Sequence, residues 1–248
     1  MKQYITEAVV LKNINYGDSN KIYTLYSKEY GKISAIARGV RKLQSRRAGN
    51  LDTLNHVKVK IHEDHKGYRS IQEVNTINAF KEIKGDLALA FKSLYILELL
   101  NRFQESDHET VEIFVELLKT LNELPKKDSI PDLVIAHFEI KLMSLLGFQM
   151  YLTKCNVCSR PLDDTWEKVK FNYALGGFVC DTCRETGLPL DKKTAHLLSD
   201  LERNTFQDYV YADSKNTIQI ADKIIKNYMH LVSDDAMRYS KLRGLTNL

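Results

Sequence analysis

The chain has 248 residues, of which 44% are hydrophobic, and a formal net charge of +4. This length and composition fit one or two globular domains with a substantial core, and the lack of any apolar run of about 18 residues excludes a transmembrane helix. The charge is uneven, because residues 1–80 carry 14 Lys and Arg against 7 Asp and Glu, whereas residues 81–248 carry 22 against 25. The N-terminal third is therefore expected to meet a polyanionic partner.

The first 80 residues predict a small β-barrel. Short strands rich in β-branched and aromatic residues are expected over residues 4–14, 21–27, 32–40, 56–62 and 68–80. The clearest alternation places Val57, Val59 and Ile61 toward a core, with Lys58 and Lys60 on the outer face. Five antiparallel strands in about 80 residues are typical of the OB fold, whose open face commonly binds single-stranded nucleic acid.

A cationic loop follows the third predicted strand. No acidic residue occurs between Glu29 and Asp52, and few apolar residues interrupt the loop, which is therefore expected to be mobile. A run of charge is often no more than solvated surface, but Lys and Arg here fit phosphate contacts of low sequence specificity. The candidate nucleic-acid-binding residues are Arg38, Arg41, Lys42, Arg46, Arg47, Lys58 and Lys60.

Tyrosines gather near this basic region, and their role is left open. Each is a candidate platform for base stacking, although packing within the barrel is the more common use of such a residue. The tyrosines concerned are Tyr4, Tyr16, Tyr23, Tyr26 and Tyr30.

Helical periodicity begins near Asp86. Residues 87–103 are apolar nearly all round, as expected of a central bundle helix, and further helices are expected near residues 131–146, 191–203 and 215–233. The predicted buried stripes of three helices are Val111, Phe114, Val115, Leu118 and Leu121; Ile135, Phe138, Leu142 and Leu145; and Ala221, Ile224, Ile225, Tyr228 and Leu231.

All four cysteines of the chain lie in two Cys-x-x-Cys pairs, namely Cys155, Cys158, Cys180 and Cys183. Two short turns that each present two thiolates are the usual way to build a closed, tetrahedral Zn²⁺ site. The segment Leu175–Phe178, with its two glycines, predicts a hairpin turn before the second pair. The sequence therefore predicts one structural zinc ion without an open position for chemistry.

Other uses of these residues are less favoured. Two disulfides or a redox pair would suit an oxidising compartment, but the N-terminus does not resemble a secretory signal. His137 and Glu139 ahead of Cys155 fit a zinc deaminase poorly, because Lys154 stands in place of proline and the second cysteine pair would have no role. The sequence contains neither a nucleotide-binding phosphate loop nor a Gly-x-Ser-x-Gly elbow.

Several motifs together resemble the RecO family of DNA repair and recombination proteins, in its zinc-containing form. Near the N-terminus these are Glu7–Leu11, Tyr16–Ser19, and Gly31–Lys42 leading into Ser45–Arg47. Phe171 with Gly176–Cys180 is similar to the zinc-bearing members, and Tyr239–Arg243 is similar to the basic C-terminal stretch of the family. The resemblance covers essentially the whole chain.

The resemblance implies an α+β, multidomain protein. It would comprise an N-terminal OB-fold β-barrel (residues 1–82) and a C-terminal helical bundle (residues 83–150 and 187–248), with a four-cysteine zinc module (residues 151–186) inserted in the bundle. It also implies a bacterial, cytoplasmic, nucleoid-associated recombination mediator that is not an enzyme. Such a protein binds single- and double-stranded DNA, anneals complementary strands and, with RecR, helps load RecA onto DNA coated by single-strand-binding protein.

An alternative is a zinc-ribbon and OB interaction module of a transcription or translation factor, in which the insert would contact nucleic acid. Between Cys155 and Cys183 three cations face four acids, so the insert is slightly acidic. A ribbon that binds nucleic acid is more often basic, which disfavours this alternative.

Overall fold

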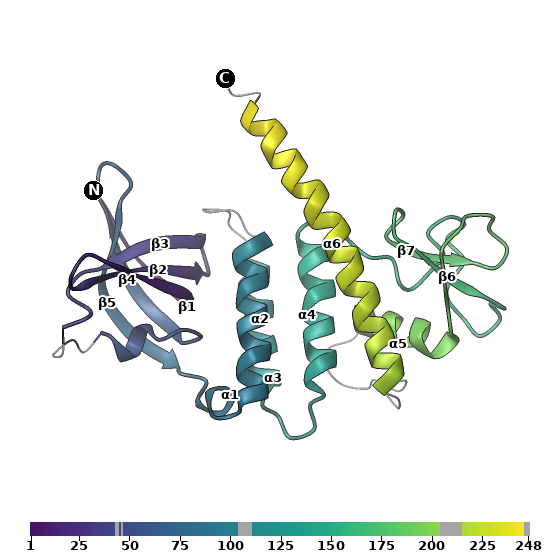
Figure 1. The fold of residues 1–248 in the computed structure, drawn as a ribbon, viewed down its shortest axis with the longest axis horizontal. Helices are drawn as coiled ribbons and strands as arrows, with labels where there is room; N and C mark the ends of the chain where they lie inside the picture. Colours follow the sequence, from purple (N-terminus) through teal and green to yellow (C-terminus); the bar gives the residue numbers. More distant parts are fainter. Residues whose placement is uncertain (43–44, 46, 104–110, 204–214, 246–248) are drawn as a thin grey trace. The chain divides into compact units, whose positions relative to one another are not determined.

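The computed structural model describes residues 1–42, 45, 47–103, 111–203 and 215–245, and the side chains of the last helix up to residue 233. Its contacts divide the chain into two compact units, Met1–Lys126 and Lys127–Leu248. Among the described residues, the first unit contains the strands β1 to β5 and three α-helices, and the second contains three α-helices and a three-stranded sheet (Figure 1). The protein is α+β, as the sequence predicts, whereas the residue bounds of the three domains stay a prediction.

Five strands of the first unit form a closed barrel in the order β1-β2-β3-β5-β4. Four neighbouring pairs are antiparallel, but β3 and β5 pair in parallel through Ile36 and Ser70, which corrects the expectation of an all-antiparallel barrel. This strand order is that of an OB fold. The strands are β1 (Lys2–Tyr16), β2 (Asn20–Ser27), β3 (Gly31–Ala37), β4 (His56–Glu63) and β5 (Arg69–Asn78).

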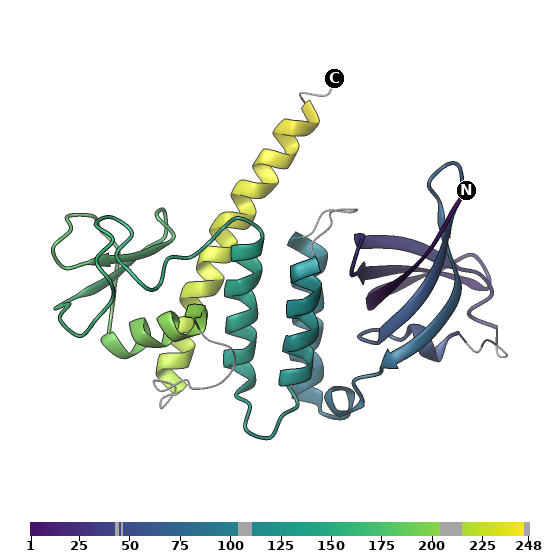
Figure 2. The ribbon, with the colours of Figure 1, turned by 180° about the vertical axis from the view of Figure 1, so that it is seen from behind.

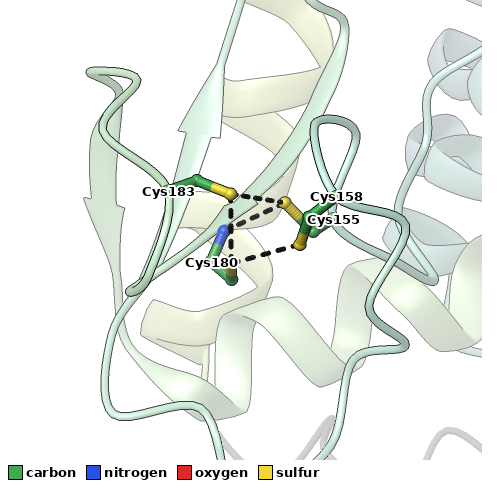
Figure 3. Close-up of side chains that lie close together, drawn as sticks. All are labelled: Cys155, Cys158, Cys180 and Cys183. Carbon is green, nitrogen blue, oxygen red and sulfur yellow. Dashed lines mark hydrogen bonds between the residues drawn. The ribbon is translucent and has the colours of Figure 1, made fainter.

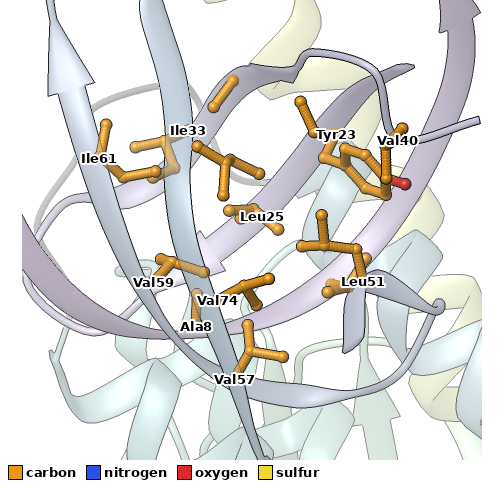
Figure 4. Close-up of a cluster of buried hydrophobic side chains, with 14 residues drawn as sticks. Ala8, Tyr23, Leu25, Ile33, Val40, Leu51, Val57, Val59, Ile61 and Val74 are labelled. Atoms are coloured by element: carbon orange, nitrogen blue, oxygen red, sulfur yellow. The ribbon is translucent and has the colours of Figure 1, made fainter. Parts of the chain in front are cut away.

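The barrel encloses an apolar core of fourteen residues (Figure 4). Val57, Val59 and Ile61 are fully buried in it, which confirms the predicted alternation along β4. The connection between β3 and β4 also contributes, because Val40 and Leu51 are buried in the same cluster. β3 ends at Ala37, three residues earlier than predicted, since the chain turns at Gly39 with a positive φ of 66°.

Two helices cover one side of this barrel. The helices of the unit are α1 (Lys81–Gly85), α2 (Leu87–Phe103) and α3 (Val111–Glu123). The ring of Phe114 in α3 stacks near Tyr26 of β2, with 6.5 Å between ring centres, and Lys32 Nζ of β3 donates to the carbonyl of Asn101 in α2 at 2.8 Å. The outer surface of β2 and β3 is therefore partly packed against helices.

Two predictions for these helices are wrong. α2 has the predicted bounds, but Leu87 and Phe91 are 73% and 65% exposed, so it is not buried all round. In α3 the predicted Phe114 and Leu121 are buried, whereas Val111 and Val115 are exposed and Ile113 and Leu117 take their places, with Thr120, on the buried face. Two overlapping apolar stripes satisfy the helical period, and tertiary packing selects one of them.

In the second unit, three helices pack together. They are α4 (Pro131–Leu145), α5 (Lys192–Arg203) and α6 (Lys215–Leu245), the last extending beyond the predicted residue 233. His137 of α4 is buried and its Nδ1 lies 2.9 Å from the carbonyl oxygen of Leu201, and Lys141 Nζ donates to the carbonyl of Glu202 at 2.8 Å. These bonds attach α4 to the C-terminal end of α5, so His137 has a packing role.

The predicted stripes of these helices hold with two exceptions. Leu145 and Leu231 are 40% and 45% exposed, and Met143 and Val232 are buried nearby. The chain between α4 and α5 forms a small sheet of order β7-β6-β8, which lies to one side of the three helices of this unit (Figure 2). Its strands are β6 (Val169–Asn172), β7 (Gly177–Cys180) and β8 (Leu188–Leu190). Among the described residues no helix is both long and apolar enough to cross a membrane.

Candidate metal centre and nucleic-acid face

The four cysteines converge, as their spacing predicts (Figure 3). Their sulfur atoms all lie within 4.8 Å of one another, with 3.6 Å between Cys158 and Cys180 and 3.9 Å between Cys155 and Cys183. A disulfide requires about 2.05 Å, whereas four sulfurs bound tetrahedrally to one ion at about 2.3 Å stand about 3.8 Å apart. The arrangement therefore fits a four-thiolate metal site and does not fit the disulfide alternative.

Backbone hydrogen bonds hold the two turns together. Cys155 N donates to the carbonyl of Arg160 at 2.8 Å, which closes the first turn, and Asn156 N donates to the carbonyl of Phe178 in β7 at 2.8 Å. Cys180 ends β7, and its backbone N–H donates to the sulfur of Cys155 at 3.4 Å. This bond joins the second turn to a sulfur of the first.

The four thiols influence one another strongly. Burial acts to raise the pKa of Cys180, but hydrogen bonds with Thr182 and Cys183 outweigh it and lower that pKa to about 6. Burial, with the neighbouring thiols of Cys180 and Cys158, raises the pKa of Cys183 to about 12. Four thiolates this close repel one another, so a bound cation is what allows all four to lose their protons.

The hairpin beside the cysteines requires its two glycines. β6 and β7 are joined by the predicted turn, and Gly176 there has a φ of 65°. A Cβ on Gly177 would stand 2.6 Å from the carbonyl oxygen of Tyr151, and one on Gly176 would stand 2.8 Å from the hydroxyl of Tyr228 in α6. Because Phe171 of β6 also meets the Tyr228 ring edge-on, with 6.4 Å between centres, the small sheet is seated on α6.

Two of the three cations between Cys155 and Cys183 have partners within the insert. The Arg160 guanidinium lies 5.6 Å from the ring centre of Trp166 and 3.2 Å from an Asp181 carboxylate oxygen. Lys170 Nζ donates to the carbonyls of Cys183 and Glu185, at 3.1 and 2.9 Å. Trp166 itself is 1% exposed. Arg160 and Lys170 therefore stabilise the insert, whereas Lys168 is exposed.

The candidate DNA-binding residues of the loop after β3 fall into two groups. Arg38, Arg41 and Lys42 are exposed, and Arg41 Nη1 donates to the carbonyl of Gly17 at 3.2 Å, which attaches the loop to the turn between β1 and β2. Arg47 instead donates from both terminal nitrogens, to the carbonyls of Ile71 and Arg38 at 3.0 and 2.7 Å. Arg47 thus connects the end of the loop that follows β3 with β5. Arg46 lies outside the residues that the structure describes.

The two candidate lysines of β4 differ as well. Lys58 is exposed on the outer face, opposite Asn75 of β5 in the register. Lys60 pairs with Glu73 of β5, with 3.0 Å between Nζ and Oε1. An exposed ion pair of this kind is weak, but it halves the local positive charge. The assignment of the seven residues to DNA contacts stays a prediction.

A polar pocket of about 400 Å³ joins the loop to the barrel face, and sequence analysis did not anticipate it. Its lining comes from the end of β3 and from the hairpin between β4 and β5, and it contains three residues that sequence analysis did not single out, His62, Tyr68 and Arg69, beside Arg38 and Arg47. The only local sign was a tyrosine directly after Gly67 at the start of a predicted strand.

Four of the five tyrosines considered as base platforms are packed instead. Tyr23 and Tyr26 are 2% and 0% exposed, and the rings of Tyr4 and Tyr30 lie against each other with 4.2 Å between centres. Tyr16 at the end of β1 remains 55% exposed.

The fold and its sites define a class of protein: an N-terminal OB-type barrel with a cationic loop, followed by a helical part that carries a four-cysteine insert. The family model described as "Recombination protein O N terminal" matches residues 1–80, and the one described as "Recombination protein O C terminal" matches residues 85–236. The chain therefore belongs to the RecO family.

Curated relatives agree with this assignment. A "DNA repair protein RecO" of Thermoanaerobacter sp. (strain X514) is 30% identical over 234 residues, covering 92% of each chain. Proteins with the same name from Caldicellulosiruptor bescii and Bacillus mycoides are 32% and 31% identical, and the matches cover 75% and 70% of this chain and 74% and 68% of theirs.

Proposed function

We propose that this chain is a recombination mediator of bacterial DNA repair and not an enzyme. It binds single- and double-stranded DNA through the barrel and its cationic loop, and it anneals complementary strands without ATP. The observation that carries the proposal is the exposure of Arg38, Arg41 and Lys42 on one loop of an OB-type barrel, in a chain of the RecO family. Lys and Arg on such a surface neutralise phosphates and release counterions.

The annealing step follows from this electrostatics. Cationic side chains that hold one strand by its phosphates reduce the repulsion felt by a second strand. Base pairing then supplies both the specificity and the driving force, so no nucleotide hydrolysis is needed. Lys58 extends the positive surface onto β4, and Arg47 orients the loop while it contributes charge.

We further propose that Cys155, Cys158, Cys180 and Cys183 hold one structural Zn²⁺. Their four sulfurs lie within 4.8 Å of one another, and four-sulfur, tetrahedral coordination is the one that structural zinc prefers. When bound, the ion would join the two turns, and its four protein ligands would leave no position for water or substrate.

The partners proposed are those that the RecO resemblance implies. With RecR, the protein would help load RecA onto DNA covered by single-strand-binding protein, in the bacterial cytoplasm and at the nucleoid. The alternative, a zinc-ribbon module of a transcription or translation factor, would place the DNA contacts in the insert. The internal partners of Arg160 and Lys170 weigh against it.

The first test is annealing of two complementary labelled oligonucleotides without ATP, at low and moderate salt. Acceleration that weakens with salt is expected, and four or five phosphate contacts predict a log–log slope of single-strand affinity between about −2.8 and −3.5. Reversing the charge of Arg38 and Arg41 to Glu should abolish both activities. Lys223→Glu with Lys193→Glu, exposed positions of the second unit, changes the net charge equally and should have little effect. A slope near zero, or equal loss in both double variants, would rule out the cationic loop as the DNA site.

A further inference from the structure

The pocket between the cationic loop and the β4–β5 hairpin offers more than positive charge. Half-buried Ile36 supplies an apolar part of its lining, whereas Ile71, which also lines it, is 2% exposed and belongs to the barrel core. Ser70 and Gln72 supply polar groups, and Gln72 Nε2 donates to Ser70 Oγ at 2.9 Å. A volume of about 400 Å³ lies within the range of small-ligand pockets. An apolar side chain beside several polar groups suits a flat heterocycle with hydrogen-bonding edges.

Tyr68 stands at this pocket with its ring open to solvent. Tyr68 is one of the residues that line the pocket, and it is 72% exposed. Among the described residues no other aromatic ring is recorded against it, unlike the Tyr4 and Tyr30 pair. An exposed ring of this kind has a free face on which a base can stack.

The backbone around Tyr68 is fixed, so its ring is presented at low entropic cost. Asp64 Oδ1 accepts hydrogen bonds from the N–H groups of Lys66 and Tyr68, at 2.8 and 2.9 Å. Asp64 N donates to the Tyr68 carbonyl at 3.0 Å, and Gly67 makes the turn with a φ of 80°. A preorganised platform loses less freedom when a ligand binds.

Of the three arginines at the pocket, Arg38 has its guanidinium available. Arg47 donates to two backbone carbonyls, and Arg69 Nε pairs with a Glu63 oxygen at 2.8 Å. Arg38 is exposed, and within the described part of the chain no hydrogen bond or ion pair of its side chain is recorded. The Asp64 carboxylate accepts bonds within its own turn, so a phosphate is expected on the Arg38 side of the pocket.

We propose that this pocket binds one unpaired nucleotide of a single DNA strand, with the base stacked on Tyr68 and a phosphate at Arg38. The proposal rests on the DNA-binding function proposed above and adds a preference for single strands. A base within a duplex is already stacked and paired, and it would have to leave the helix before it reached Tyr68. The loop cations, in contrast, contact phosphates of either form.

The test compares a labelled oligo-dT of about 20 nucleotides with a duplex of the same length, by fluorescence anisotropy on the full chain. Tyr68→Ala should weaken oligo-dT binding by about 5- to 150-fold, which is the usual effect of losing one stacked base. Its duplex affinity and its salt slope should stay unchanged, because no phosphate contact is removed. Tyr68→Phe keeps the ring and should bind as the wild type does.

Two further variants separate stacking from charge. Arg38→Ala should weaken both ligands and reduce the single-strand salt slope by about 0.7. Phe91→Ala removes another exposed ring, 65% exposed on α2, and should change nothing. If Tyr68→Ala bound oligo-dT as the wild type does, or lost equal affinity for the duplex, the nucleotide pocket would be ruled out. DNA binding by the loop would not be affected by that result. If the wild type bound neither ligand, the proposed function itself would fall, and this pocket with it.

Discussion

The barrel and the cysteine module reach stability by opposite routes. The barrel closes five strands of seven to fifteen residues around fourteen buried side chains, and every strand has two neighbours. The module has strands of only three or four residues, and its two Cys-x-x-Cys turns meet at sulfur atoms. Small units with little core commonly need a metal or disulfides to persist. The barrel therefore should stand without a cofactor, and the module should not.

The largest expected effect is the loss of the proposed zinc ion. Cys180→Ser, or a chelator, should reduce the zinc content from the proposed one ion to almost none and unfold the module, because structural zinc contributes about 10–16 kcal/mol in small zinc domains. Trp166 is the single tryptophan of the chain and is 1% exposed within the module. Its emission should shift to the red while the far-ultraviolet signal of the barrel persists.

Thr182→Ala is a suitable control for that variant. Thr182 lies between the two ligands of the second turn, with its hydroxyl 3.0 Å from the Cys180 sulfur, but it supplies no ligand sulfur. It should keep the metal and the Trp166 emission. Full zinc retention in Cys180→Ser would contradict the four-ligand assignment, and an unchanged emission after chelation would show that the module stands on its packing against α6 alone.

A substitution in the barrel core should destabilise the barrel and leave the cysteine module unchanged. Leu25 of β2 is fully buried in the core, so Leu25→Ala should lower the free energy of unfolding of the barrel by about 2–5 kcal/mol. Urea unfolding followed by circular dichroism measures this loss, while zinc content and Trp166 emission in buffer should not change. Ile14→Ala, at a position 59% exposed on β1, should cost less than about 1 kcal/mol. Equal losses in the two variants would mean that the buried cluster is not the source of stability.

Strand alternation, cysteine spacing and turn glycines can be predicted from the sequence because each depends on residues close together in the chain. Alternation identified Val57, Val59 and Ile61 as core residues because one face of a barrel strand is always buried. The spacing of the cysteines predicted that their four sulfurs converge, because each x₂ turn brings its two sulfurs to one side. The hairpin before Cys180 followed from its glycines.

The remaining features depend on contacts between distant residues. Both apolar stripes of α3 satisfy the helical period, so the burial of Leu117 rather than Val115 depends on tertiary packing that the period does not encode. Likewise, the pocket of Tyr68 exists because β3 and β5 pair in parallel at Ile36 and Ser70, which are 34 positions apart. No local periodicity encodes such a pairing. Sequence analysis therefore located the cations of the proposed DNA face and missed the aromatic side chain beside them.

The smallest effect concerns the place where α3 meets the barrel. His56 of β4 is buried under Phe114, with 5.8 Å between ring centres, and its Nε2 lies 3.0 Å from Glu7 Oε2. Burial lowers the pKa of His56 below its usual 6.5, and the Glu7 carboxylate opposes this shift without reversing it. The unfolded chain then binds more protons than the folded one just below pH 6.5, so stability should fall as the pH drops from 6.5 through the lowered pKa.

Urea unfolding of the wild type from about pH 7.5 to about pH 5 measures this dependence. His56→Gln removes the titrating group and should flatten the curve below pH 6.5, whatever its effect on stability at neutral pH. His65→Gln, at an exposed position in the β4–β5 turn, should keep the wild-type slope. If His56→Gln kept the wild-type dependence of stability on pH, the acid sensitivity would come from other groups. The buried His56 imidazole would then not be the group whose protonation destabilises the barrel.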